Sequence, residues 1–332
     1  MTILGIETSC DETSAAVVLN GRTILSNVVS SSVDFHKKTG GIVPEVAARK
    51  QVESIIPVLD ECLSLAKTTL KKIDAIAVTA GPGLLGSLIV GTATAKTLAL
   101  SLNKPLIPVN HLLAHIYTNW LEENIPDFPL ISLIVSGGHT QLILMKNHKD
   151  IKILGETRDD AAGESFDKVA RILNLGYPGG PAIEKKALDF KSKETSLVLP
   201  KPLIHSKDYD FSFSGLKTAA FTAFKTKKHT ACEIAHSFQE AVCEVLVKKT
   251  VKAVLENKVN SVVLAGGVSA NKRLRELFFK NEQLEKMKIK VYIPKIALCT
   301  DNAASIASCA FYHRNITQLE QVLPNSSLFF EN

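Results

Sequence analysis

The two halves of the sequence repeat one plan of strands and turns, and this repeat restricts the fold more than any other feature. Each half opens with two apolar runs joined by a polar turn, at residues 2–9 and 14–19 and again at 130–135 and 140–145. Later in each half a short apolar run ends at glycines, within residues 73–83 and 259–267. The repeat predicts an α/β protein of two duplicated lobes, with a ligand bound between them.

The segments between these runs carry apolar residues at helical spacing. Helices are expected over residues 46–70, 87–100 and 230–257, and Pro57 should kink or split the first of them. The polar turn at Ser9–Thr13 predicts a hairpin with an exposed acidic tip.

Composition narrows the class of protein. At 332 residues and 45% hydrophobic, the chain is long enough for two cores. Six cysteines without a CxxC pair indicate a reducing compartment. We expect no membrane span, signal peptide or transit peptide, and therefore a cytoplasmic protein. The net charge of +6 and a lysine-rich middle stretch fit either a nucleic-acid surface or a solvated face.

His111 and His115 are the candidate metal ligands. They follow an apolar run and stand four residues apart at the start of an expected helix, which places both imidazoles on one face. Chance spacing of unrelated histidines is the alternative. A third ligand would come from one of six carboxylates, namely Asp11, Glu12, Asp160, Glu164, Asp167 and Asp301.

The spacing of these carboxylates does not select the third ligand. Asp301 precedes an expected helix of small residues, and the first interpretation is that Asp301 or Thr300 is the N-cap of that helix. Asp160, Glu164 and Asp167 follow a helical period that also describes a solvated acidic face.

Glycines gather after three of the expected strands, at residues 81–86, 137–138 and 266–267. Each cluster can be a tight turn, but together they favour a phosphate-bearing ligand, because glycine lets backbone N–H groups approach an oxyanion. None matches the P-loop. The run Gly81-Pro82-Gly83-Leu84-Leu85-Gly86 fits GxGxxG, yet no acidic residue follows about 20 positions on, which argues against a dinucleotide site.

Taken together, the motifs resemble the TsaD family of tRNA threonylcarbamoyladenosine synthesis proteins, once described as glycoproteases. The resemblance covers the chain up to about Gln318. Besides the two histidines, the segments that carry it are Gly5–Thr13, Gly40–Glu45, Thr79–Leu84, Val135–Thr140, Asp160–Lys168, Tyr177–Pro181, Phe211–Thr218, Ala265–Asn271 and Cys299–Asn302.

The resemblance implies a two-lobed actin-like/Hsp70-like ATPase (ASKHA) fold with duplicated lobes and a central nucleotide-binding cleft. Its lobes would be residues 1–108, joined by a C-terminal helix at about 312–325, and residues 109–311, with a helical insertion at about 155–230. The implied activity is transfer of threonylcarbamoyl from threonylcarbamoyl-AMP to N6 of the adenosine 3′ of the anticodon, in tRNAs reading codons that begin with A.

The same resemblance implies site residues and partners. His111, His115 and Asp301 would hold one divalent metal ion per subunit. Fe²⁺ is the expected ion, and Zn²⁺ is the alternative. The positions that match the family's substrate site are Ile134, Val135, Ser136, Gly137, Gly138, Asp167, Gly180 and Asn271. His139 lies in a family motif and receives no role. Besides tRNA, the implied partners are a TsaB-like paralogue of the same fold and a small TsaE-like P-loop ATPase; the mitochondrial form of the family is a homodimer.

Chemistry and alternatives follow from the residues. An adenylate is already activated, so the protein must orient it and stabilise charge; we hypothesise that Asp11 and Glu12 position the adenine amine or the phosphates. A metallopeptidase is the first alternative, but position 112 is leucine where the zincin motif HExxH has its glutamate. A non-catalytic ATPase-fold scaffold is the second, and the two histidines with Asp301 argue against it.

Overall fold

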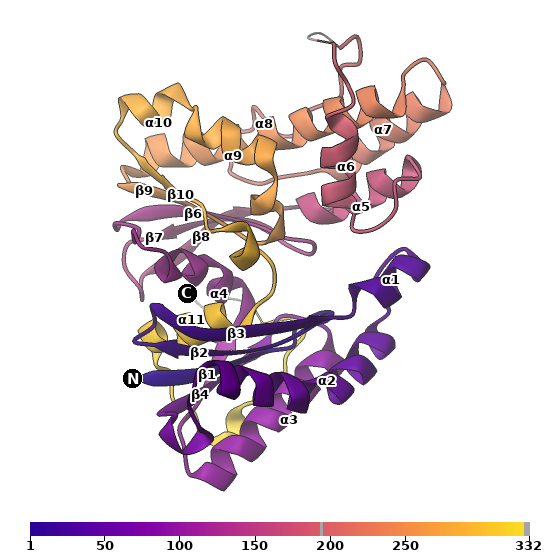
Figure 1. Cartoon of the computed structure of the whole chain (residues 1–332). Helices are drawn as coiled ribbons and strands as arrows, with labels where there is room; N and C mark the ends of the chain where they lie inside the picture. Colours follow the sequence, from indigo (N-terminus) through magenta and orange to yellow (C-terminus); the bar gives the residue numbers. More distant parts are fainter. Residues whose placement is uncertain (193–194, 329–332) are drawn as a thin grey trace. The chain divides into compact units, whose positions relative to one another are not determined.

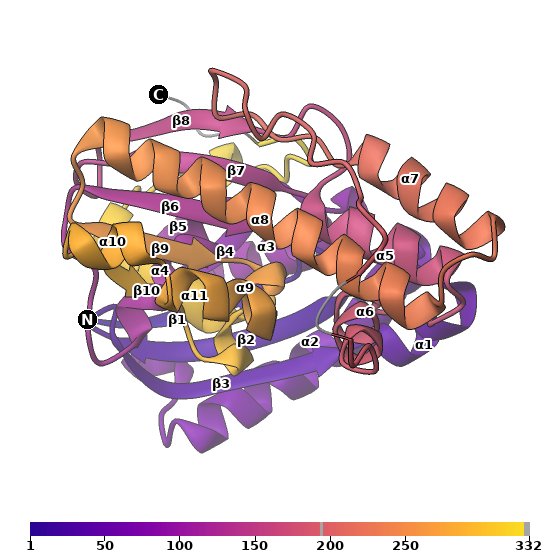
Figure 2. The same cartoon turned by 90° about the horizontal axis from the view of Figure 1, so that it is seen from above.

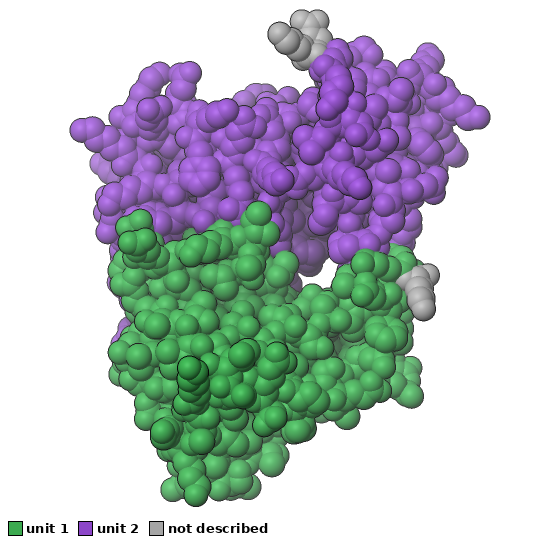
Figure 3. Space-filling view, viewed as in Figure 1, with its two compact units in different colours: residues 1–125, 294–332 green, residues 126–293 purple. Residues whose placement is uncertain are grey.

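The chain folds into two compact units, each built on one five-stranded sheet (Figure 1). The computed structural model describes residues 1–192 and 195–328. Unit 1 comprises Met1–Ile125 and Pro294–Asn332, and unit 2 comprises Pro126–Ile293; Figure 3 colours them separately. Unit 1 is therefore discontinuous in sequence.

The sheet of unit 1 has the order β3-β2-β1-β4-β5. Its strands are β1 (Thr2–Glu7), β2 (Glu12–Leu19), β3 (Thr23–Ser31), β4 (Ala75–Gly81) and β5 (Leu106–Asn110). The first three form an antiparallel meander, whereas β4 and β5 add in parallel to β1.

Helices cover both faces of this sheet. They are α1 (Val33–Thr39), α2 (Pro44–Leu65), α3 (Leu85–Leu102), α4 (His111–Tyr117) and α11 (Ala303–His313). Because side chains alternate along a strand, Leu4 and Ile6 of β1 join the core with α2 and α3. Gly5 faces the other way, and a Cβ there would lie 2.3 Å from the Ala303 carbonyl oxygen of α11. Glu7 has the parity of Gly5 and so lies on the α11 side.

The sheet of unit 2 repeats this topology with the order β10-β9-β6-β7-β8. Its strands are β6 (Leu130–Val135), β7 (Thr140–Met145), β8 (Ile151–Glu156), β9 (Ser261–Ala265) and β10 (Lys290–Tyr292). Read from β8, each strand corresponds in order and direction to one in unit 1, with β6 in the place of β1 and β9 in that of β4. The duplication predicted from the sequence is confirmed.

The helices of unit 2 are α5 (Ala162–Ile172), α6 (Gly179–Ala187), α7 (Ser214–Lys225), α8 (Ala231–Asn257), α9 (Lys272–Phe279) and α10 (Glu282–Lys286). The long helix α8 lies along the sheet (Figure 2). Its Phe238 meets Phe166 of α5 edge to face, with ring centroids 5.1 Å apart, so α5 is fixed against α8.

The unit boundaries differ from the expected lobes. The division falls at residue 125 rather than 108, and α11 belongs to unit 1 rather than to the second lobe. The reason is packing: α4 and α11 lie against the sheet of unit 1. The expected helix at about 312–325 is not found, since α11 ends at His313 and only a 3₁₀ turn, Leu319–Gln321, follows among the described residues.

Two local expectations are also corrected, the exposed hairpin tip and a split of the helix at Pro57. The hairpin tip is not exposed, because Ser9 and Asp11 are buried. Pro57 does not split α2, which runs without interruption from Pro44 to Leu65. By length and composition alone, the helix α3 could cross a membrane, although the sequence predicted no such segment. Polar residues interrupt its apolar runs, and in the structure the helix packs against β4 and α2.

Candidate functional site

The two candidate histidines lie on α4, at the point where β5 ends. The Asn110 side chain caps this helix by accepting the backbone N–H groups of Leu112 and Leu113 at 2.9 and 3.1 Å. The cap fixes His111 as the first helical residue and His115 one turn later. Their ring centroids are 4.5 Å apart and their planes meet at 68°. Both are largely buried, with 12% and 3% of their side chains exposed.

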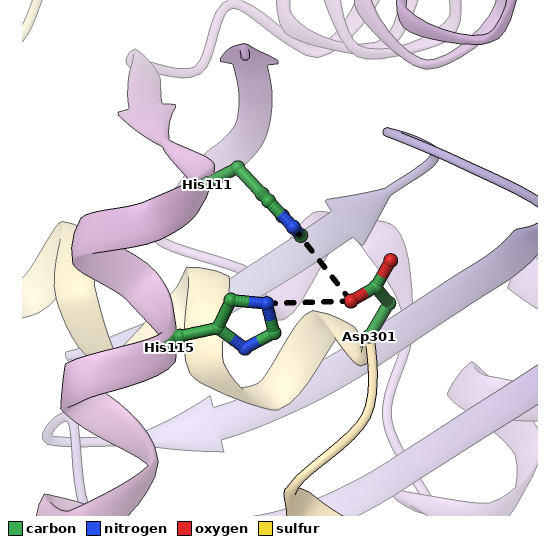
Figure 4. Close-up of side chains that lie close together, drawn as sticks. All are labelled: His111, His115 and Asp301. Carbon is green, nitrogen blue, oxygen red and sulfur yellow. Dashed lines mark ion pairs between the residues drawn. The ribbon is translucent and has the colours of Figure 1, made fainter. Parts of the chain in front are cut away.

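Asp301 completes a three-residue group (Figure 4). Its Oδ1 lies 3.6 Å from His111 Nε2 and 3.4 Å from His115 Nε2. It is not the N-cap of α11: Asn302 caps that helix by accepting the Ser305 N–H at 3.1 Å. Asp301 is thereby left to face the histidines.

The geometry of this group fits a metal ion. Tetrahedral coordination at zinc–nitrogen distances of about 2.0–2.1 Å places ligand atoms about 3.3 Å apart, close to the two distances from Asp301. His115 Nε2 is buried without a hydrogen-bond partner, and such an orphaned atom costs free energy unless something binds it. Two imidazoles and one carboxylate are ordinary ligands for zinc or iron(II). No other group of this kind occurs within residues 1–192 and 195–328.

Glu7 stands behind His111 at the end of β1. Its carboxylate is 1% exposed and accepts the Ser9 N–H at 2.5 Å and the Thr79 hydroxyl at 2.6 Å. Its Oε2 lies 3.1 Å from His111 Nδ1. Burial lowers the pKa of His111, but the carboxylates of Glu7 and Asp301 outweigh it and raise that pKa to about 9.

The turn between β1 and β2 is held from several directions. The Gln51 amide of α2 donates to the carbonyl oxygens of Cys10 and Glu12 at 3.0 and 2.9 Å. Ser32 donates to the Asp11 carbonyl, and the Leu84 N–H to that of Ser9 at 2.7 Å. These bonds explain why the acidic turn is buried.

We expect Gln51→Met to lower the free energy of unfolding by about 1–3 kcal/mol, because it keeps the volume but removes the side-chain donor that the Cys10 and Glu12 carbonyls share. Chemical denaturation measures this loss, and hydrogen exchange should localise faster opening to the amides of residues 9–12. The matched control is Gln141→Met, a buried glutamine of unit 2 that donates to Glu156 and should leave exchange in the turn unchanged. Unaltered exchange in Gln51→Met would contradict the anchoring role.

Asp11 and Glu12 lie on this turn, in the electrostatic field of Asp301. Burial and the charges of Asp301 and Asp11 raise the pKa of Glu12 far above its ordinary range. The Ser31 hydroxyl donates to Glu12 Oε1 at 3.3 Å. Asp11 and Glu12 are not part of the three-residue group, so Asp301 is the third member the structure selects.

In unit 2 the predicted substrate positions lie at the end of β6, in the turns after β6 and β9, and in or next to α5, α6 and α9, and these segments contact one another in a closed ring. The turn after β6 carries Ser136, Gly137 and Gly138, and a Cβ on Gly163 of α5 would lie 2.5 Å from the Ser136 carbonyl oxygen. Asp167, one helical turn further, accepts the Gly179 N–H at the start of α6 at 2.6 Å.

The ring continues through α6 and α9. Glu184 of α6 accepts the Lys272 N–H at 3.2 Å, next to Asn271, which caps α9. A Cβ on Gly266 would lie 2.5 Å from the Val135 carbonyl oxygen, which closes the ring at β6. At Gly137, Gly138, Gly180 and Gly267, by contrast, a Cβ would meet nothing within 4 Å. These glycines leave open space rather than make packing contacts.

Asp160 and Glu164 are engaged elsewhere. Asp160 pairs with Lys168 at 2.7 Å and Lys217 at 3.2 Å, and Glu164 also pairs with Lys168. Burial raises the pKa of Asp160, but the two lysines outweigh it and hold that pKa below its ordinary value. The solvated-face interpretation therefore fails for Asp160, which ties α5 to α7.

This depressed pKa predicts a pH-dependent contribution to stability. The contribution is complete above the unfolded-state pKa of about 3.9 and is lost as pH falls through the lower folded-state pKa. We expect Asp160→Asn to lower the free energy of unfolding by at most about 1 kcal/mol at pH 7, since the lysines are partly exposed. Denaturant titrations from pH 7 to 3 should show that difference shrinking below pH 5; a difference independent of pH would contradict it.

Sequence reasoning missed the roles of Glu7, Gln51 and Thr79. Glu7 carried one signal, because it is a charged residue at the end of a strand that is otherwise apolar. Gln51 and Thr79 carried none, since their partners lie 39 to 72 residues away.

Comparison with known proteins identifies the same family as the sequence motifs did. The family model described as TsaD, tRNA N6-adenosine threonylcarbamoyltransferase, matches residues 23–308. The enzyme of that name from Syntrophomonas wolfei is 51% identical, covering 94% of this chain and 92% of its own. The one from Symbiobacterium thermophilum is 53% identical, covering 93% and 91%.

A solved structure of HypF from T. kodakarensis is similar in fold. It aligns with a TM-score of 0.64 at 16% identity, over 97% of this chain and 48% of its own. The likeness supports the fold class alone, the actin-like/Hsp70-like ATPase architecture expected from the sequence. Because the family model matches most of this chain, the chain belongs to the TsaD family of tRNA N6-adenosine threonylcarbamoyltransferases.

Proposed function

We propose that this protein transfers the threonylcarbamoyl group of threonylcarbamoyl-AMP to N6 of the adenosine 3′ of the anticodon, in tRNAs reading codons that begin with A. Membership of the family carries this proposal. The site agrees with it, because position 112, between the two histidines, is leucine rather than the glutamate of HExxH, and an activated anhydride needs no protein nucleophile.

His111, His115 and Asp301 are the proposed ligands of one divalent metal ion, Fe²⁺ by preference and Zn²⁺ otherwise. When bound, the ion supplies Lewis acidity toward a carbonyl or phosphate oxygen. The orphaned Nε2 of His115 and the two distances to Asp301 support this assignment.

The ring of loops in unit 2 is the proposed substrate site. Ile134 to Gly138, Asp167, Gly180 and Asn271 would hold the adenylate, whose phosphate meets the open glycines and their backbone N–H groups. Asp11 and Glu12 are proposed to position the adenine amine or the phosphates.

The proposed partners are tRNA, a TsaB-like subunit of the same fold and a small TsaE-like P-loop ATPase, and the proposed compartment is the cytoplasm. These assignments rest on the family.

The deciding experiment joins metal analysis to a transfer assay. Purified protein with its partner subunits, an anticodon stem-loop and threonylcarbamoyl-AMP should yield threonylcarbamoyladenosine, and elemental analysis should find about one metal ion per chain. A control RNA with guanosine at the acceptor position should remain unmodified. Metal-dependent peptide cleavage without transfer would instead support the metallopeptidase alternative, and neither activity would support a scaffold.

A further inference from the structure

Glu7 has a defined set of partners, and they constrain the protonation of His111. Its Oε1 accepts the Ser9 N–H, and its Oε2 faces both the Thr79 hydroxyl and His111 Nδ1. Both carboxylate oxygens of Glu7 already act as acceptors, from the Ser9 N–H and the Thr79 hydroxyl, and an accepting oxygen needs a donor at His111. The contact at 3.1 Å is therefore a hydrogen bond only if His111 Nδ1 carries the proton.

The Ser9 hydroxyl offers His111 a competing arrangement. Its Oγ lies 3.2 Å from the same Nδ1 and could donate to it if that nitrogen carried no proton. The Nδ1 lone pair would then face Glu7 Oε2 at 3.1 Å, which is repulsive. Glu7 thus selects the tautomer protonated at Nδ1.

We propose that Glu7 is a positioning residue that keeps the proton of His111 on Nδ1 when the proposed metal ion binds, so that Nε2, which faces Asp301, is the nitrogen left to bind the ion. The inference rests on the proposed metal site but not on the transfer reaction. The alternation of β1 supports it, because Glu7 shares the parity of Gly5 and lies on the side of the sheet that α11 covers. Carboxylates hydrogen-bonded to metal-ligating histidines commonly fix ring orientation in this way.

Glu7→Gln is the most direct test, because a glutamine side chain has nearly the same shape as a glutamate side chain. With its oxygen in the place of Oε1, the glutamine can still accept the Ser9 N–H, and its NH₂ group then takes the place of Oε2 and faces both the Thr79 hydroxyl and His111 Nδ1. That contact favours the tautomer protonated at Nε2, which cannot bind a metal through Nε2, the nitrogen that faces Asp301. We expect the affinity for Zn²⁺, measured by chelator competition on the full chain, to fall about 10- to 100-fold.

Thr79→Val is the matched control, since it removes a hydrogen bond from the same carboxylate oxygen without touching His111. It should keep the affinity for Zn²⁺ within about threefold, whereas a merely structural role of Glu7 would predict equal losses in both variants. Glu7→Asp, which retains the charge, should recover part of the affinity.

If Glu7→Gln does not fold, a spectroscopic measurement on the unaltered protein still tests the inference. Nitrogen-15 NMR of the Zn²⁺-loaded protein should show His111 protonated at Nδ1. Deprotonated Nδ1, or wild-type Zn²⁺ affinity in Glu7→Gln, would overturn the inference. If Glu7→Gln weakens Zn²⁺ binding while the unaltered protein transfers nothing to tRNA, the proposed function fails and this inference stands.

Discussion

His115→Ala is expected to leave the protein without bound metal and to lower kcat/KM for transfer by about 10³-fold or more, since loss of several kcal/mol of charge stabilisation costs about tenfold per 1.4 kcal/mol. Removal of His115 is the most direct test of the ligand set, because its Nε2 is buried and has no hydrogen-bond partner. Elemental analysis and single-turnover transfer measure the two effects.

His36→Ala is the control for this substitution. His36 is also fully buried in unit 1 but lies against Ser32 and the Val43 N–H, outside the three-residue group. Its loss should lower stability and leave metal content unchanged. One equivalent of metal with full transfer in His115→Ala would refute the proposed ligand set.

Two glycines of the ring in unit 2 should respond to alanine in opposite ways. Gly266 has φ +86° and a Cβ there would lie 2.5 Å from the Val135 carbonyl oxygen. Gly266→Ala should therefore cost about 2–4 kcal/mol through backbone strain and displacement of β6. Gly137 has no positive φ and open space around it, so Gly137→Ala should fold normally.

Binding should show the reverse order. If the open space at Gly137 receives the phosphate, a methyl group there should weaken threonylcarbamoyl-AMP binding by about tenfold or more, by displacing the phosphate from the backbone N–H groups. Thermal melting and calorimetric titration separate the two effects. Wild-type affinity in Gly137→Ala would show that the adenylate does not use this turn.

The sequence predicted those features that depend on local pattern. Apolar runs joined by polar turns located both hairpins, and their recurrence predicted two duplicated lobes, which the matching strand orders of the two sheets confirm. The positions of the glycine turns followed for the same reason, because a strand must end where the backbone turns.

Features that depend on distant contacts were not predictable. The sequence predicted an exposed hairpin tip because the donors to its carbonyls, which include Gln51, Ser32 and Leu84, lie far along the chain. Local capping preference favoured Asp301 as a helix cap, yet Asn302, one residue on, takes that place. The choice among six carboxylates for the third ligand needed tertiary structure, or the family resemblance that named Asp301.

The discontinuity of unit 1 has a consequence for biosynthesis. The two histidines are translated about 190 residues before Asp301, and all of unit 2 is made in between. Unit 2 is contiguous, so it can fold while the ribosome is still adding the remainder. The three-residue group can assemble only once the last segment has emerged and α11 has docked on β1. Metal loading through all three ligands therefore follows the synthesis of unit 2 and of α11.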